Sequence, residues 1–208
     1  MSTLYDLLEK YQNHAVSSRE KGTYFENLVK AYFENDDVQS RFYDKVWHYA
    51  DWVEEQGIGA TRKDRGIDLV ARLAGTVDQF CAIQCKFYSK EHRLQRSDID
   101  SFFADSNRKP FVRRILIDTT EVPLGKNAQA LFEDSNQYIE SLRIDLNALA
   151  NSRIDWEIFV QRDEVVLHDK KTLRQHQRDA LEAVQEGLEQ ADRGKLIMAC
   201  GTGKTFTA

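Results

Sequence analysis

Three polar side chains stand inside two short apolar segments of the chain. Asp68 lies in residues 66–70, and Gln84 and Lys86 lie in residues 82–87. Alternate residues of a strand share a face, so Gln84 and Lys86 point the same way if this segment is a strand. A hairpin of the two segments would bring all three side chains together. A carboxylate, an amide oxygen and an ammonium group in one cleft suit a hard cation such as Mg²⁺ with a water beside it, and the lysine can orient that water or stabilise developing negative charge.

This pattern resembles the PD-(D/E)xK nuclease superfamily, most closely its Mrr-like restriction branch. In that branch a Gly-x-Asp strand start is followed by a strand bearing Glu-x-Lys or Gln-x-Lys, which residues 66–68 and 84–86 match. The resemblance implies a Mg²⁺-dependent DNA endonuclease, with Mn²⁺ as a substitute metal. It also implies metal ligation by Asp68, Gln84 and the main-chain carbonyl of Cys85. Gln84 replaces the more common glutamate, and a neutral amide is a weaker ligand than a carboxylate.

An ordinary sheet edge with surface salt bridges is the competing interpretation of these residues. Asp, Gln and Lys are common on surfaces, and their spacing alone fits many proteins. Their flanks are strongly apolar, however, and include Ile67, Leu69, Ile83 and Phe87. Polar groups within buried strands need a partner or a function, which favours the site.

Glu26 is a further candidate for catalysis and metal binding. In the same superfamily an acidic residue on the first core helix often completes the metal site, and Glu26 matches it. A capping box is the alternative, since Thr23 and Glu26 have the spacing at which the glutamate bonds back to the start of a helix. The sequence leaves both roles open.

Basic residues near these segments are candidates for phosphate contacts. Arg62, Lys63 and Arg65 form a basic loop before the first strand, and Lys90 follows the second. We expect these four residues to bind DNA, although a basic loop also serves solubility. Asp64, in the same loop, is interpreted as an exposed charge rather than a carboxylate that supports the metal site.

The elements that must position these residues alternate between helices and strands. Residues 151–171 are harder to interpret, because 156–160 and 165–167 fit either short strands or a connector. The remaining pattern predicts helices at 3–13, 23–35, 47–57, from 97 onward, 125–134 and 173–190, and strands at 67–73, 80–87, 111–118 and 138–143, with a turn at Gly75. This order predicts an α/β fold, a restriction-endonuclease-like core with a central mixed β-sheet flanked by helices.

The C-terminal residues have the pattern of a phosphate-binding loop after a buried strand at 196–199. Glycines let backbone N–H groups surround a phosphate, a lysine reaches it, and a threonine hydroxyl holds Mg²⁺. The residues resemble motif I of superfamily-two helicases, and the resemblance implies that an upstream glutamine reads adenine. The predicted nucleotide-binding residues are Gly201, Thr202, Gly203, Lys204, Thr205 and Gln177. Because the chain ends at Ala208, with the motor incomplete, we expect ATP to act only in a full-length protein.

The combination resembles the single-polypeptide Type ISP restriction-modification enzymes. It predicts a nuclease domain over 1–165, and a connector with the truncated start of a RecA-like ATPase domain over 166–208. The resemblance implies double-stranded DNA as the substrate, and a motor, a methyltransferase and a target-recognition region downstream. The alternative is a catalytically inactive nuclease-fold module for DNA binding or docking, which Gln84 favours and Lys86 opposes.

Composition sets broad limits on these hypotheses. The 208 residues are 41% hydrophobic and 30% charged, which is typical of a globular domain. The net charge of −5 counts against a simple nucleic-acid binder, although a metal site also requires acidic groups. No signal peptide or membrane-spanning run is recognisable, and the three cysteines are interpreted as reduced thiols of a cytoplasmic protein.

Overall fold

A computed structural model describes residues 4–14, 17–57, 66–134, 138–169, 172–193 and 195. The chain forms two compact units, Met1–His168 and Asp169–Ala208. The helix α9 (Gln175–Gln190) belongs to the second unit, and the elements described next belong to the first. Among the described residues, no helix combines the length and the apolar character needed to cross a membrane.

The first unit is built on a mixed sheet of five strands in the order β1-β2-β3-β4-β5. The β1–β2 and β2–β3 pairs are antiparallel, whereas β3–β4 and β4–β5 are parallel. The strands are β1 (Tyr43–His48), β2 (Leu69–Leu73), β3 (Phe80–Lys86), β4 (Phe111–Asp118) and β5 (Glu140–Ile144). The predicted mixed sheet is therefore confirmed. So is the hairpin between β2 and β3, where Gly75 turns with φ +77°.

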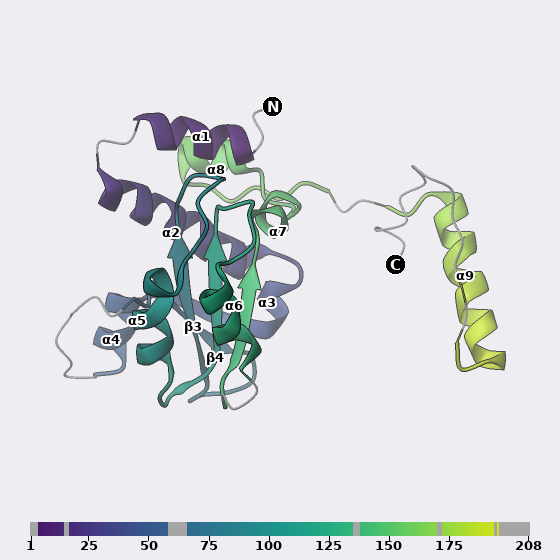
Figure 1. Ribbon diagram of the computed structural model, residues 1–208. Helices are drawn as coiled ribbons and strands as arrows, with labels where there is room; N and C mark the ends of the chain where they lie inside the picture. The colour runs from purple at the N-terminus through teal and green to yellow at the C-terminus, as the bar shows by residue number, and fades with distance from the viewer. Residues whose placement is uncertain are drawn as a thin grey trace. The chain divides into compact units, whose positions relative to one another are not determined.

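Helices cover both faces of this sheet (Figure 1). The α2-side layer also contains α1, α7 and α8, and the α5-side layer also contains α4 and α6. The helices are α1 (Leu4–His14), α2 (Ser18–Asn35), α3 (Gln39–Phe42), α4 (Tyr49–Glu55), α5 (Arg96–Ser106), α6 (Lys126–Glu133), α7 (Leu146–Ala150) and α8 (Trp156–Arg162).

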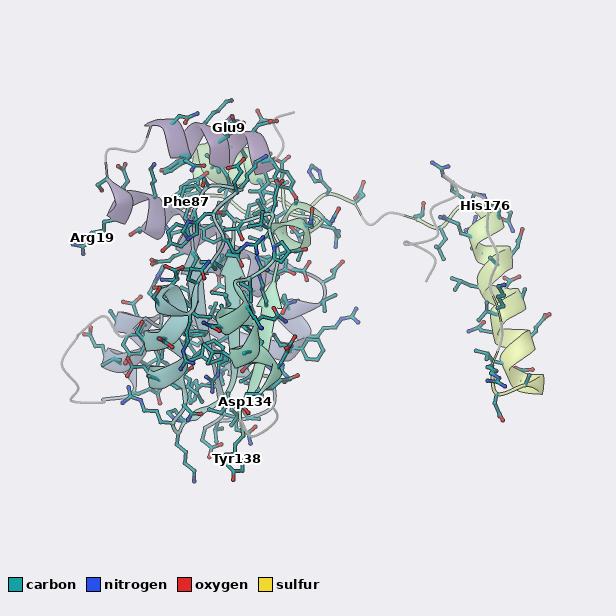
Figure 2. All side chains as sticks on the ribbon, in the orientation of Figure 1. Glu9, Arg19, Phe87, Asp134, Tyr138 and His176 are labelled. Atoms are coloured by element: carbon teal, nitrogen blue, oxygen red, sulfur yellow. The ribbon has the colours of Figure 1, made fainter. Side chains whose placement is uncertain are left out.

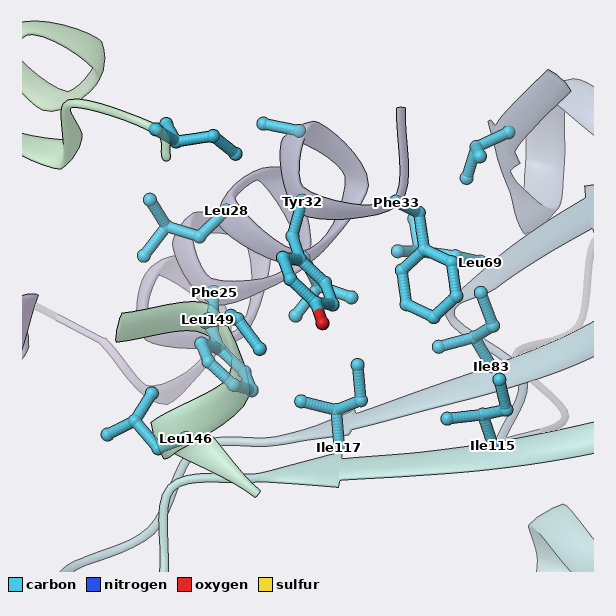
Figure 3. Close-up of a cluster of buried hydrophobic side chains, with 14 of the residues drawn as sticks. Phe25, Leu28, Tyr32, Phe33, Leu69, Ile83, Ile115, Ile117, Leu146 and Leu149 are labelled. Carbon is cyan, nitrogen blue, oxygen red and sulfur yellow. The ribbon is translucent and has the colours of Figure 1, made fainter. Parts of the chain in front are cut away.

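Each layer has its own apolar core. Figure 3 shows the α2-side core, where Phe25, Leu28 and Phe33 of α2 lie over Ile83 and Ile117 of the sheet. These side chains are all at most 1% exposed. Successive residues of a strand point to opposite faces, so the long apolar runs of β3 and β4 supply both cores at once.

The predicted helix through Trp47 is wrong in its first part. Residues up to His48 form the edge strand β1, and α4 begins only at Tyr49. The aromatic spacing was misleading, because Trp47 reaches the α5-side core from a strand and Trp52 reaches it from a helix. Both indole rings pack near Phe80, with ring centroids 6.2 and 5.4 Å away.

The predicted capping box at Thr23 is also wrong. Helix α2 begins five residues earlier, where the Ser17 hydroxyl accepts a hydrogen bond from the amide of Glu20 (3.1 Å). Thr23 and Glu26 therefore lie inside the helix. Glu26 has no capping role, so its carboxylate needs a different explanation.

Two further helix starts differ from the prediction. Helix α5 begins at Arg96 rather than at residue 97 and is capped by Gln95 and Asp98, where the main-chain amide of Gln95 donates to the Asp98 carboxylate (2.7 Å). Residues 156–160, for which strands were one option, form α8. The Asp155 carboxylate accepts from the amide of Ile158 (3.0 Å), which satisfies the start of that helix.

A buried ion pair joins the ends of the parallel strands β4 and β5. The Asp118 side chain is 0% exposed, and Arg143 donates to both of its carboxylate oxygens (2.7 and 2.9 Å). Thr120 donates to the same carboxylate from its amide and its hydroxyl. A buried carboxylate that loses its cationic partner is strongly destabilising.

We therefore expect Arg143→Ala to lower the free energy of unfolding by about 3 kcal/mol, because it strands the Asp118 charge. Urea denaturation measures this. Arg96→Ala is the matched control, because its pair with Asp100 is more than half exposed (58% and 53%) and contributes at most about 0.5 kcal/mol. Equal losses in the two variants would contradict a structural role for the buried pair.

Candidate active site

The Asp68 carboxylate is held at the end of the hairpin between β2 and β3. The register of these strands reaches Leu69↔Ile83 without a shift, so its continuation sets Asp68 beside Gln84. The Asp68 amide donates to the Ile83 carbonyl (3.0 Å), and Oδ2 accepts from the amide of Cys85 (2.7 Å). Asp68 therefore joins the strands through its backbone and its side chain.

Gln84 is a buried polar residue, only 2% exposed, on the α5-side face of β3. Its Oε1 atom is buried without a hydrogen-bond partner among the described residues. Leaving a buried acceptor unpaired costs about 1–3 kcal/mol. This oxygen is therefore suited to an electropositive ligand.

Lys86 is the last residue of β3 and is half-buried. It shares the face of Gln84, two residues away. The register sets it beside Asp118, but that carboxylate is already held by Arg143 and Thr120. Figure 2 shows that Phe87, the next residue, lies at the α1 end of the sheet, opposite Asp134 and Tyr138.

The chain after Lys86 is fixed by the chain after β4. The Thr119 amide donates to the Lys86 carbonyl (3.1 Å). The Thr119 hydroxyl accepts from the Tyr88 amide (2.9 Å) and donates to the Tyr88 carbonyl (2.7 Å). The backbone that carries Lys86 is thus held in place by Thr119.

Glu26 reaches the same strand end from helix α2. Burial raises the pKa of the Cys85 thiol well above its ordinary value, and the carboxylates of Asp68 and Glu26 raise it further, whereas Lys86 lowers it. Three predicted site residues therefore lie close enough to one thiol to act on it electrostatically. Glu26 Oε2 also lies 3.7 Å from Nδ1 of His48.

The oxygen atoms at this strand end are hard donors of the kind that Mg²⁺ prefers. They belong to Asp68, Glu26, Gln84 and the main-chain carbonyl of Cys85. This carbonyl faces β2, because the Cys85 amide also points toward β2. In the described part of the chain, no three His, Cys, Asp or Glu side chains are grouped to hold a metal ion. A cation here would need the amide and the carbonyl, and the unpaired Gln84 oxygen fits that need.

Of the predicted DNA-binding residues, only Lys90 lies in the described part of the chain. Its ammonium is 3.4 Å from Glu121 and 5.5 Å from the ring centroid of Tyr5. Its side chain is 50% exposed, so it remains accessible to a phosphate. Arg62, Lys63, Arg65 and the neighbouring Asp64 lie outside the described residues.

Among the predicted nucleotide-binding residues, Gln177 is the only one in the described ranges. It is buried, and its Oε1 accepts a hydrogen bond from the amide of Arg174 (2.8 Å) at the start of α9. This capping contact was not predicted. Gly201, Thr202, Gly203, Lys204 and Thr205 lie outside the described residues, as does the strand expected at 196–199.

Comparison with known proteins identifies the family. A family profile described as a restriction endonuclease, of the catalytic Mrr type, matches residues 34–166. The chain belongs to this restriction endonuclease family. In this endonuclease chain, residues 170–208 match a second profile, described as the res subunit of Type III restriction enzymes. The predicted order of an Mrr-like nuclease followed by a helicase-like fragment is thereby confirmed.

A solved structure supports the same assignment. The ATP-dependent Type ISP restriction-modification enzyme LlaBIII bound to DNA is 31% identical to this endonuclease chain, with a TM-score of 0.67. The match covers 100% of this chain and 12% of LlaBIII. It confirms the predicted restriction-endonuclease-like fold and the Type ISP resemblance.

Two other comparisons add little. MspJI restriction endonuclease in complex with an oligonucleotide is 16% identical over 71% of this chain and 29% of its own, with a TM-score of 0.38, too low to support an argument. A search of curated proteins found no match.

Gly66 lies in a crowded position next to the site and gives a test of its packing. A Cβ atom there would lie 2.7 Å from Ser101 Oγ and 3.3 Å from Gln84 Nε2, on a backbone with φ +73°. Gly75 has a similar φ of +77° but nothing within 4 Å. We expect both Gly→Ala variants to lose about 1 kcal/mol through backbone strain, and Gly66→Ala to lose about 1–2 kcal/mol more through crowding.

Urea denaturation of the two variants measures the difference. Because both variants carry the same backbone strain, the difference between their losses in free energy of unfolding measures the close packing of Gly66 against Gln84 and α5. A loss no larger for Gly66→Ala than for Gly75→Ala would show that the position is open.

Proposed function

We propose that this restriction endonuclease domain hydrolyses phosphodiester bonds of double-stranded DNA with a divalent metal, Mg²⁺ or Mn²⁺. Asp68, Gln84, Glu26 and the Cys85 carbonyl would hold the metal, and Lys86 would act beside it. The observation that carries the proposal is the buried, unpaired Oε1 of Gln84. Beside Gln84 lies the Asp68 carboxylate, which accepts a hydrogen bond from the amide of Cys85, the next residue of β3. An apolar side chain of the same size at position 84 would make the folded protein more stable.

The chain's own residues divide the work of hydrolysis. When bound, the metal supplies positive charge at the phosphate and acidifies a water. Asp68 is oriented for this by the hydrogen bond that its Oδ2 accepts from the Cys85 amide. Lys86 supplies a cation that can orient the attacking water or stabilise the charge that develops on the phosphate. Arg62, Lys63, Arg65 and Lys90 would bind the DNA backbone and carry no sequence information.

We also propose that cleavage is coupled to an ATP-driven translocase in a longer protein. LlaBIII is ATP-dependent and was determined bound to DNA, and this chain corresponds to 12% of it. The nuclease domain would end near residue 165. The segment 166–208 would begin a RecA-like domain that binds ATP through residues 201–205 and Gln177. A complete motor, a methyltransferase and a target-recognition region would follow.

The first test is nicking of supercoiled plasmid DNA by excess protein. We expect cleavage with Mg²⁺ or Mn²⁺ and none with EDTA. Asp68→Ala and Lys86→Ala should each reduce the rate by about 100-fold or more, since each removes charge from the reacting centre. Gel electrophoresis of the plasmid forms measures the rate.

Lys30→Ala is the matched control, because Lys30 forms a partly exposed pair with Glu34 on helix α2. It should cleave at the unsubstituted rate. Equal cleavage rates for Asp68→Ala and the unsubstituted chain would contradict the proposal. DNA binding without cleavage in any metal would instead favour the inactive docking module.

Gln84 allows a sharper test, because a ligand and a core residue respond differently to substitution. Gln84→Met preserves the volume and removes the unpaired Oε1, so the free energy of unfolding should rise by about 1 kcal/mol. Plasmid nicking should nevertheless fall by about 10–100-fold, since a ligand is lost.

Gln84→Glu is the complementary change. It buries a charge, so the variant should be less stable than the unsubstituted chain without metal and should gain more thermal stability on adding Mn²⁺. Thermal denaturation with and without Mn²⁺ measures both effects. Normal nicking by Gln84→Met would mean that Gln84 only fills the core.

A further inference from the structure

His48 lies on the backbone that also holds Asp68. It is the last residue of β1 and pairs with Leu69, the first residue of β2. The amide of Tyr49, the next residue, donates to the Asp68 carbonyl (2.9 Å). The residue that follows His48 therefore makes a main-chain contact with Asp68, a proposed metal ligand.

The His48 side chain extends toward helix α2. Val46, two residues earlier on the strand, belongs to the α2-side core, and alternate strand residues share a face. Nδ1 of His48 lies 3.7 Å from Oε2 of Glu26, and the two side chains are 30% and 25% exposed. Both groups are thus partly shielded, at the same end of the sheet as Asp68.

The Glu26 carboxylate also lies close to its own helix. Its Oε1 lies 3.7 Å from the point that a Cβ on Gly22 would occupy, one turn earlier. The carboxylate therefore folds back along α2, between Gly22 and the His48 imidazole. A glutamate side chain has three torsions and loses rotamer entropy when it is fixed, so a neighbouring group that limits its range pre-organises it.

We propose that His48 is a positioning residue that holds the Glu26 carboxylate in place for the metal. This inference rests on the proposed function, because it gives Glu26 the role of a metal ligand. His48 itself does not contact the metal. It acts through one oxygen of Glu26, and its substitution should matter only while Glu26 is present.

The test uses three substitutions of His48 in the whole chain. His48→Ala removes the imidazole. His48→Asn keeps a nitrogen near the place of Nδ1, the atom that faces Glu26, whereas His48→Gln carries its nitrogen farther out, near the place of Nε2. Mn²⁺ affinity, measured by electron paramagnetic resonance without DNA, is the first readout, and the Mn²⁺ concentration that gives half-maximal nicking is the second.

We expect His48→Ala and His48→Gln to weaken Mn²⁺ binding about tenfold, as for other residues that orient metal ligands, and His48→Asn to restore most of it. In a Glu26→Ala background, His48→Ala should have no further effect, which is the mark of action through Glu26. Lys30→Ala, on the same helix, should bind Mn²⁺ normally. Circular dichroism checks that every variant is folded, and if His48→Ala unfolds, the comparison of Asn with Gln still decides.

Two results would overturn the inference. In the first, His48→Ala and His48→Gln bind Mn²⁺ as tightly as the unsubstituted chain, while Asp68→Ala no longer binds it. The other is an equal loss from His48→Ala with and without Glu26. Failure of the proposed function looks different, because Asp68→Ala would then neither weaken Mn²⁺ binding nor reduce nicking.

Discussion

The hydrogen bond from the Cys85 amide to the Asp68 carboxylate is the contact on which the site depends. It joins the first residue before β2 to the strand that carries Gln84 and Lys86, so it sets the carboxylate at a defined distance from both. Each neighbouring feature reinforces this junction. Tyr49, the first residue of α4, donates its amide to the Asp68 carbonyl, and the backbone after Lys86 is fixed by Thr119. The polar residues stand on strands packed on both faces, which suits a site that must be held within a fraction of an ångström.

The two cores explain how one strand end can gather residues from opposite layers. Gln84 and Lys86 belong to the α5-side face, while Glu26 arrives from α2 on the other. Glu26 lies near His48, and His48 pairs with Leu69, so both layers contribute polar residues to the end of the sheet where β2 begins. Burial raises the pKa of the Cys85 thiol at this strand end, the carboxylates of Asp68 and Glu26 raise it further, and Lys86 lowers it.

Much of this arrangement followed from local patterns. The strands β2, β3 and β4 were predictable because each is a short, strongly apolar run, and Gly75 indicated the turn of the hairpin between the first two. The placement of Asp68, Gln84 and Lys86 at one end of this hairpin was therefore predictable without a structure. Strand β1 was missed because Trp47 and Trp52 mimic a helical period. The start of α2 was misplaced because Thr23 imitates a cap that Ser17 supplies. No sequence pattern indicated the proximity of His48 to Glu26. The sequence analysis placed His48 in a helix rather than in strand β1, and it placed Glu26 at the start of α2 rather than inside it.

The central claim is that a cation binds between Asp68 and the unpaired oxygen of Gln84. Crystals of the chain soaked in Mn²⁺ and measured for anomalous scattering at the manganese edge test this directly. The account predicts one strong peak within coordination distance, about 2.0–2.3 Å, of Asp68 and Gln84 Oε1. A peak elsewhere, or a Gln84 amide that instead pairs with protein in the soaked crystal, would contradict it.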